Sequence, residues 1–387
     1  MAEAEFDKKI DAWVETINKH KGEETVPMLS PYPVDEKNFY GQQGIEYITP
    51  ATIRHYCGAI GERNPLFWNE EYAKGTRWGG IIAPPTFTDA IAISWVTDRE
   101  PPPVSWTFPR NPGGVKRELF QPIRPGDKIR LVDKWLGYEE RKSKEPRPYR
   151  LFVESVQKSY INQKDEVAAA CTSNFVVLIT REDPSGQSLF SGGGGDRKRH
   201  KFTKAEIDAI YRSLEEDWRQ GADKLSSDKV KVGDELKPLL TLPYTTLDSA
   251  AFFCAQQGHA VGFDIRWERY IKPNPGGARL DPETNAPHGG GEVHLLDGPH
   301  GYGYGLGYQF DGLLSRLVCN WMGDDGSVKE LETRYRTLPI LGDAYTMKGK
   351  VTNKSSEGGQ NLVDLELRCE NQDGLLISSG TAKVQLP

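Results

Sequence analysis

Two distant segments of the chain share one order of residues, and this internal repeat constrains the fold more than any other feature. Residues 118–130 read ELFQPIRPGDKIR, and residues 332–345 read ETRYRTLPILGDAY. In each, a proline precedes a Gly-Asp step, which is typical of a tight turn that leads into a strand. Long stretches with strand character follow both turns, and a helical segment with an apolar, glycine-containing stretch precedes each. The chain is therefore predicted to be an α+β duplication.

The chain has 387 residues, a length that suits two domains better than one core. The predicted parts are an N-terminal helical extension (1–44), a first domain (45–185), a glycine-rich linker with a helix (186–240) and a second domain (241–387). A helix is expected in the linker because Thr203 and Glu206 form a capping box. The extension should also be helical, since apolar residues recur there at helical spacing. They are Phe6, Ile10, Trp13, Val14 and Ile17.

Composition narrows the classes of function. With 49 basic and 55 acidic side chains the formal charge is −6, which argues against a general nucleic-acid binder, since that would need a basic stripe. No apolar stretch approaches the roughly 18 residues of a membrane helix, and the N-terminus does not resemble a signal peptide. We therefore expect no membrane association and a cytoplasmic location.

The five cysteines are scattered and include no CxxC pair. This pattern gives no support for a disulfide framework or a zinc cluster. Each cysteine lies in or beside an apolar segment, so we predict five buried free thiols and no metal site. The cysteines are Cys57, Cys171, Cys254, Cys319 and Cys369.

Residues 51–87 carry a recognisable signature, which returns more weakly in the second half. Its residues in the first half are Gly61, Asn64, Pro65, Tyr72, Ala73, Arg77, Trp78, Gly79, the Ala83-Pro84-Pro85 turn and Pro125-Gly126-Asp127. Its residues in the second half are Leu313, Arg316, Trp321, Pro339, Gly342 and Asp343. The chain resembles the two-domain MaoC-like dehydratases, a family of (R)-specific enoyl-CoA hydratases. The resemblance implies two fused hotdog domains, each an antiparallel sheet wrapped around a central helix, a homodimer, and an acyl-CoA substrate.

The first half departs from the family's active loop, G-D-x-N-P-x-H, whose Asp and His flank the reacting carbons. Glu62 stands at the Asp position, but Phe67 stands at the His position and cannot move a proton. The resemblance implies that this silent copy binds a bulky acyl chain instead. The aromatic side chains assigned to that pocket are Phe67, Trp68, Trp78 and Phe87. They can equally be core residues, and Glu62 can equally form a surface pair with Arg63.

The second half carries both chemical groups in exchanged places. Aligned on the same loop, Gly258 takes the glycine position, His259 the Asp position and Asp264 the His position. A neutral imidazole suits the task of deprotonating water, and a carboxylate can orient it or carry the proton. The alternative is that His259 stabilises a helix C-terminus and that Asp264 is a solvated loop residue.

His300 and Gly301 match the family's His-Gly step, which supplies a backbone N–H to the thioester oxygen. Gly301 is therefore the expected oxyanion donor, or a glycine needed only for the turn. An insertion over residues 271–293 separates this step from Asp264 and is either a lid or a surface excursion. His288 and His294 lie in the same region and compete with His259 for the role of base.

These residues predict reversible hydration of a trans-2-enoyl-CoA to a 3-hydroxyacyl-CoA. His259 would be the general base, Asp264 its partner and Gly301 the oxyanion donor, with His300 and Arg316 binding substrate. No metal or redox cofactor is required. Two alternatives stay open: a hotdog acyl-CoA thioesterase, and a catalytically silent partner subunit that binds acyl-CoA.

Overall fold

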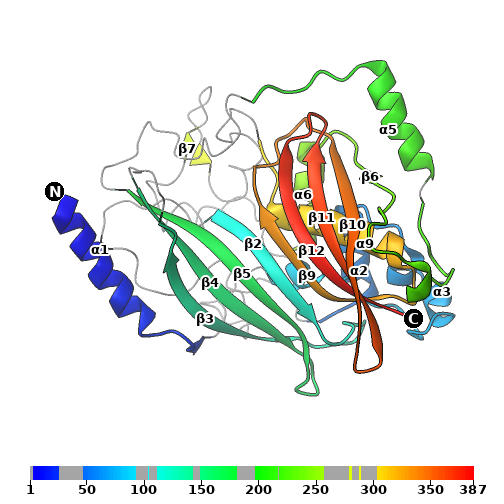
Figure 1. The fold of residues 1–387 in the computed structure, drawn as a ribbon, viewed down its shortest axis with the longest axis horizontal. Helices are drawn as coiled ribbons and strands as arrows, with labels where there is room; N and C mark the ends of the chain where they lie inside the picture. The colour runs from blue at the N-terminus through cyan, green and yellow to red at the C-terminus, as the bar shows by residue number, and fades with distance from the viewer. Residues whose placement is uncertain are drawn as a thin grey trace.

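A ten-stranded antiparallel sheet dominates the computed structural model (Figure 1). The structure describes residues 3–25, 47–92, 103, 111–142, 149–180, 197–216, 218–256, 279–280, 287–288 and 303–387. The strand order is β1-β3-β4-β5-β2-β9-β12-β11-β10-β6. The strands of the first half are β1 (Glu24–Thr25), β2 (Asn111–Leu119), β3 (Arg130–Glu140), β4 (Tyr149–Ile161) and β5 (Val167–Thr180). Those of the second half are β6 (Leu239–Leu240), β9 (Ser327–Tyr335), β10 (Tyr345–Glu357), β11 (Gln360–Asn371) and β12 (Leu376–Leu386).

The two halves meet in the middle of the sheet, where β2 pairs with β9. The register runs from Gly114 opposite Arg334 to Glu118 opposite Glu330. Each half therefore contributes one side of a continuous curved sheet, as the green and orange strands of Figure 1 show. The strands of each half surround its own helices, which confirms the predicted α+β class. The domain boundaries proposed above stay a prediction.

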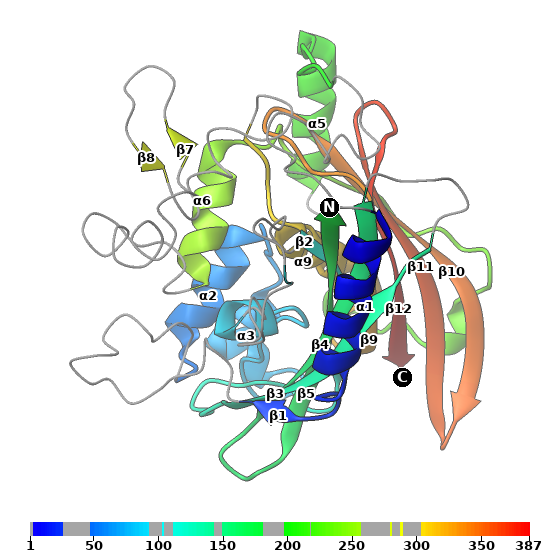
Figure 2. The ribbon, with the colours of Figure 1, turned by 90° about the vertical axis from the view of Figure 1, so that its left-hand side faces the viewer.

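Helices lie on the concave side of the sheet. In the first half they are α2 (Pro50–Ala59), the short 3-10 turn η1 (Pro65–Phe67), α3 (Glu70–Lys74) and α4 (Thr88–Ile91). In the second half they are α6 (Thr246–Ala255) and α9 (Gly307–Met322). All residues of α9 except Gly307 and Leu313 are buried, so it is the central helix of its half. Figure 2 shows α2 beside α6, and the rings of Tyr56 and Phe252 lie 6.2 Å apart at this contact. Two-residue strands β7 (Arg279–Leu280) and β8 (Pro287–His288) pair within the predicted insertion.

The predicted N-terminal helix is confirmed as α1 (Glu3–Asn18). Phe6, Ile10, Trp13 and Ile17 are buried, and Val14 packs against them. They face Trp135, Tyr138 and Phe152 on the outer side of the sheet, where they form a small second core. The apolar stripe thus covers a sheet face that the central helices do not reach.

Both predicted Gly-Asp turns are confirmed. Gly126 and Gly342 have φ angles of +95° and +99°, a left-handed conformation that favours glycine. The following carboxylates tie the turns down: Asp127 accepts a hydrogen bond from the backbone N–H of Arg124 at 2.8 Å, and Asp343 accepts one from the Gln372 side chain at 3.0 Å. The two copies therefore use one device to start β3 and β10.

The connection between the halves contains α5 (Lys204–Glu216) and the 3-10 turn η2 (Ser227–Lys229). The predicted capping box is present, since the N–H of Thr203 donates to Glu206 at 2.6 Å and that of Glu206 donates to Thr203 Oγ1 at 3.3 Å. Beyond η2, the segment 230–241 runs along β10 and exchanges backbone hydrogen bonds with it. For example, the N–H of Gly233 donates to the carbonyl of Val351 at 2.9 Å, and the N–H of Leu236 donates to the carbonyl of Gly349 at 2.9 Å. This edge segment occupies donors and acceptors on the outer edge of β10.

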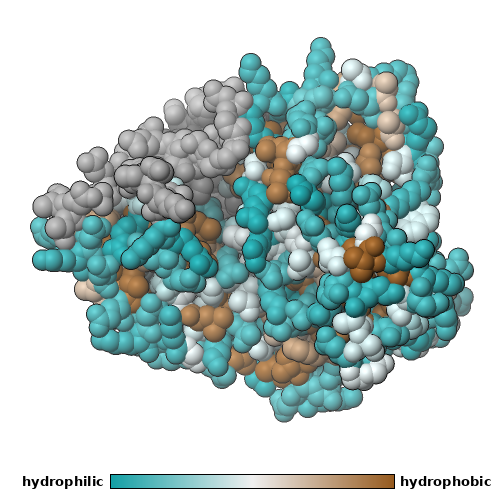
Figure 3. Space-filling view, viewed as in Figure 1, coloured by the Kyte–Doolittle hydropathy of each residue, from teal (hydrophilic) through white to brown (hydrophobic). Residues whose placement is uncertain are grey.

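Cysteine burial was predicted correctly at four of the five positions. Cys57, Cys171, Cys319 and Cys369 are buried free thiols, but Cys254 is exposed, because it lies on the outward face of α6. Within the described ranges, no group of three or more His, Cys, Asp or Glu side chains is placed to hold a metal ion. In the same residues, no helix is long and apolar enough to cross a membrane. The face in Figure 3 is mainly hydrophilic, with separate small apolar areas.

Candidate active site

The loop after α2 has the shape of a rigid hairpin around an internal carboxylate. Gly61 has a φ angle of +65°, which lets the chain reverse after the helix. The Glu62 carboxylate accepts a hydrogen bond from the N–H of Asn64 at 2.8 Å. The side chain of Asn64 accepts from the N–H of Leu66 at 3.0 Å and donates to Asp324 at 3.0 Å. These bonds fix the first copy of the family loop against the end of α9.

Glu62 does not form a surface pair with Arg63, and that alternative is wrong because the carboxylate is buried. Burial raises the pKa of Glu62, while the N–H of Asn64 and the charge of Arg316 oppose the shift. Arg63 is exposed and donates to the carbonyl of Leu214 at 3.3 Å. Because Glu62 is held by backbone N–H groups and a neighbouring arginine, its role in this copy is to organise the loop.

A mainly apolar cavity of about 210 Å³ lies beside this loop, between the two halves. Of the predicted pocket residues, Phe67 and Trp78 line it. The other lining residues include Leu66, Ile82, Ala83, Pro84, Ile123, Met322 and Val328. Phe67 therefore fills the position where the family has its His, and the described residues give this copy no imidazole at the cavity.

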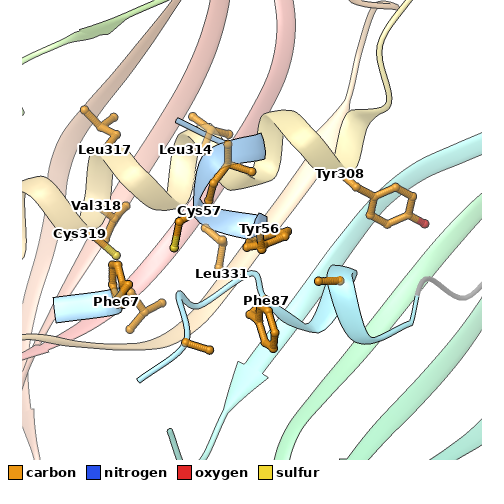
Figure 4. Packing of buried hydrophobic residues seen from close by; sticks show 14 of the residues in the cluster. Tyr56, Cys57, Phe67, Phe87, Tyr308, Leu314, Leu317, Val318, Cys319 and Leu331 are labelled. Carbon is orange, nitrogen blue, oxygen red and sulfur yellow. The ribbon is translucent and has the colours of Figure 1, made fainter. Parts of the chain in front are cut away.

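The other two aromatic residues assigned to the pocket lie elsewhere. Phe87 is buried in the main core, where its ring meets Tyr56 edge-on at 5.6 Å (Figure 4). Trp68 is 42% exposed and donates its ring N–H to the carbonyl of Arg63 at 3.2 Å. Neither lines the cavity, so the pattern of four aromatic residues mixes core, surface and pocket positions.

Arg316, the predicted substrate-binding residue of α9, is buried and lines a second cavity of about 250 Å³. This cavity lies between the end of α2 and the start of α6, and Tyr244, Asp248 and Gln309 also line it. A Cβ at Gly61 would come within 3.0 Å of the Arg316 guanidinium. Arg316 thus packs beneath the loop of the first copy, where its charge compensates Glu62.

The proposed catalytic residues His259, Asp264 and Gly301 lie outside the described residues, and so do His294 and His300. His288 lies in β8, but the structure describes nothing of its side chain. The flanking elements are described: α6 ends at Ala255 and α9 begins at Gly307. In the sequence, the proposed second copy of the loop follows α6 and precedes α9.

A buried charge cluster at the centre of the molecule escaped the sequence analysis. Nη2 of Arg117 lies 2.7 Å from Asp89 Oδ2 and 2.9 Å from Asp311 Oδ2. Arg117 comes from β2, Asp89 from α4 and Asp311 from α9, so the cluster joins both halves. Tyr335 also donates to Asp311 at 2.7 Å. The available signal was an aspartate inside an apolar helical stretch in each half, TFTDAIAI and YQFDGLLS, because a buried carboxylate needs a partner.

Comparison with protein families supports the dehydratase resemblance for the first half. Residues 38–171 match the family model of the FAS1-like dehydratase domain region. A curated protein of Streptomyces avermitilis named "UPF0336 protein" is 29% identical over 82 residues, which are 21% of this chain and 55% of that protein. The chain thus spans about half the length of that curated relative.

Solved structures resemble the whole chain. A MaoC-like dehydratase matches with a TM-score of 0.59 and 17% identity, over 96% of this chain and all 100% of that one. A putative MaoC domain dehydratase of Chloroflexus aurantiacus matches with a TM-score of 0.55 and 12% identity, over 95% of each chain. A Mycobacterium tuberculosis protein described as a double hotdog matches with a TM-score of 0.54 and 12% identity, over 95% and 96%. The chain therefore has the double hotdog fold, and the predicted resemblance to two-domain MaoC-like dehydratases is confirmed.

Proposed function

We propose that the chain catalyses reversible hydration of a trans-2-enoyl thioester, with CoA as the thiol. The observation that carries the proposal is the dehydratase match over residues 38–171, within which the loop keeps its structural residues but has lost its imidazole. Asn64 still caps the turn, whereas Phe67 is buried at the position of the base. A dehydratase with one silent copy needs its proton-transfer groups in the other half.

In this proposal the second copy supplies the chemistry. The His259 imidazole takes a proton from water while the water oxygen bonds to the β-carbon of the enoyl group. The Cα–Cβ double bond becomes an enolate, which the N–H of Gly301 stabilises. Asp264 orients the imidazole, receives the proton from the His259 imidazolium and delivers it to the α-carbon, so atoms and charge balance without a metal or a redox cofactor. His300 and Arg316 are proposed to position the substrate.

The first copy is proposed to receive the acyl group. Its cavity is lined mainly by apolar side chains, as a hydrocarbon or ring-bearing acyl chain requires. We expect Phe67 and Trp78, which line this cavity, to contribute more to acyl selectivity than Trp68 and Phe87. Assembly as a homodimer and a cytoplasmic location belong to the same proposal.

Loss of enoyl absorbance with short, branched, aromatic and polycyclic enoyl-CoAs tests the reaction. His259→Ala and Asp264→Asn are each expected to lower kcat/KM by about 10²- to 10⁴-fold, the usual contribution of general acid–base catalysis. His288→Ala tests the rival base from the same region and is expected to keep activity if His259 is the base. Full activity in both His259→Ala and Asp264→Asn would contradict the assignment of these residues as the catalytic pair. Release of thiol from saturated acyl-CoA, with no change in enoyl absorbance, would instead select a thioesterase.

A further inference from the structure

The cavity beside Phe67 is built by both halves and has a distinctive rim. Its floor comes from the loops at residues 66–67 and 82–85, and one wall comes from residues 322–329, where α9 turns into β9. Phe120, at the end of β2, lines the cavity although it is 56% exposed. An exposed aromatic side chain at the entrance gives the cavity an apolar lip.

Two cationic side chains, Arg77 and Lys329, line the same cavity. Arg77 stacks over the Trp78 ring at 4.1 Å and donates to the carbonyl of Gly326 at 3.2 Å. Lys329 makes no ion pair among the described residues. Burial lowers the pKa of Lys329, and the charge of Arg77 lowers it further. One copy of the chain thus brings a cation from each half to one opening.

The two nearby acidic side chains have other partners, and the carboxylate of Asp324 accepts hydrogen bonds from Asn64 and Tyr72. Burial lowers the pKa of Arg77, and the charge of Asp325 opposes this shift. Asp325 also forms an ion pair with Lys224 at 3.3 Å. Among the described residues no acidic side chain lines the cavity, and two repelling cations are each stabilised when an anion lies between them.

The interior of the cavity is apolar and small. Leu66, Phe67, Ile82, Ile123 and Val328 supply most of the wall. An apolar cavity of about 150 Å³ can hold benzene, so about 210 Å³ admits one ring or a short aliphatic segment. The volume does not admit a nucleotide, which would have to stay at the rim.

We propose that this cavity binds an amphiphile whose apolar part enters between the halves and whose anionic group lies between Arg77 and Lys329. The anionic group is the carboxylate of a short fatty acid, because the pantetheine arm of an acyl-CoA would separate its phosphates from an acyl group held in a cavity of about 210 Å³. The site is the cavity proposed above to receive the acyl group, so this inference rests on that part of the proposed function, but it does not require the hydration chemistry itself. Binding there would be measurable in a chain with no turnover.

Calorimetric titration of the full chain with octanoate and with 1-octanol tests the anionic requirement, because the two share one apolar tail. Octanoate is expected to bind about tenfold more tightly, the contribution of a partly buried charged hydrogen bond. Arg77→Gln and Lys329→Gln should each remove most of that difference while leaving the affinity for octanol unchanged. Both substitutions lie at the rim, so the thermal midpoint should change little.

Lys74→Gln is the matched control, since it removes the same charge from an exposed ion pair with Glu70 and Lys74 does not line the cavity. It should leave octanoate binding intact. Titration with CoA alone tests the nature of the anion: CoA binding that requires Lys329 would place a phosphate between the two cations and would overturn the assignment to a carboxylate. Equal affinity for octanoate and octanol, an equal effect of Lys74→Gln, or no binding of any probe would overturn the proposal.

Discussion

At the scale of single residues, the cluster of Arg117, Asp89 and Asp311 shows how a duplicated chain shares one cation. Arg117 and Thr333 stand at equal separations from the turn glycines Gly126 and Gly342, so they are equivalent positions of the two repeats. Only the first repeat has an arginine there. That side chain contacts both aspartates, and the cluster has two acidic groups for one basic group.

This imbalance makes stability depend on pH. Burial raises the pKa of Asp89 to about 7, and the nearby Asp311 adds to the effect while Arg117 opposes it. An aspartate in an unfolded chain titrates near pH ~4. Between these values the folded protein binds a proton that the unfolded chain does not, so the free energy of unfolding falls as pH rises, by up to ~1.4 kcal/mol per pH unit.

Asp89→Asn is expected to flatten this decline between about pH 4 and pH 7. Urea unfolding at several pH values within the window measures the slope, which is independent of any constant loss of stability. Asp165→Asn is the control, because that aspartate is exposed on a hairpin. Equal slopes for the native chain and Asp89→Asn would show that another group binds the proton.

At the scale of elements, the pairing of β2 with β9 depends on a glycine. Gly114 has a φ angle of +147°, and a Cβ there would come within 2.2 Å of the carbonyl oxygen of Thr333 on β9. A side chain would therefore push apart the two strands that join the halves.

Gly114→Ala is expected to lower the free energy of unfolding by about 3 kcal/mol, from the backbone strain and the clash together. Gly80→Ala is a suitable control, because nothing lies within 4 Å of the added Cβ. The comparison is made by denaturant unfolding of both variants. Equal stability of the two variants would mean that β2 and β9 can separate at little cost.

At the scale of the whole molecule, the halves should unfold together. They share a continuous sheet and a buried ion cluster to which each contributes an aspartate. Hydrogen exchange is therefore expected to give the same opening free energy for the amides of β4 and β11. Protection of β11 that persists after β4 has opened would show two independent folding units.

The sequence predicted those features of the fold that depend on short local patterns. The Gly-Asp turns, the N-terminal helix and the Thr203 capping box were found because each depends on residues a few positions apart. The sequence could not show that Phe67 and Trp78 line the cavity while Phe87 is in the core and Trp68 is exposed, because strands distant in the sequence decide which side chains are buried. The ion pair of Arg117 with Asp311 could not be predicted either, because it joins residues of the two halves. The catalytic assignments rest on alignment alone and stay predictions.

The edge segment 230–241 has a consequence beyond the fold of a single chain. An open strand edge offers free N–H and C=O groups to the strands of other molecules, and this is a common start of aggregation. Here the connection that fuses the halves takes up such groups on β10, from Tyr345 to Val351. Fusion therefore supplies its own protection against intermolecular strand addition, and removing this connection should favour insoluble assemblies while also uncovering the part of the core against which Val230 and Leu236 pack.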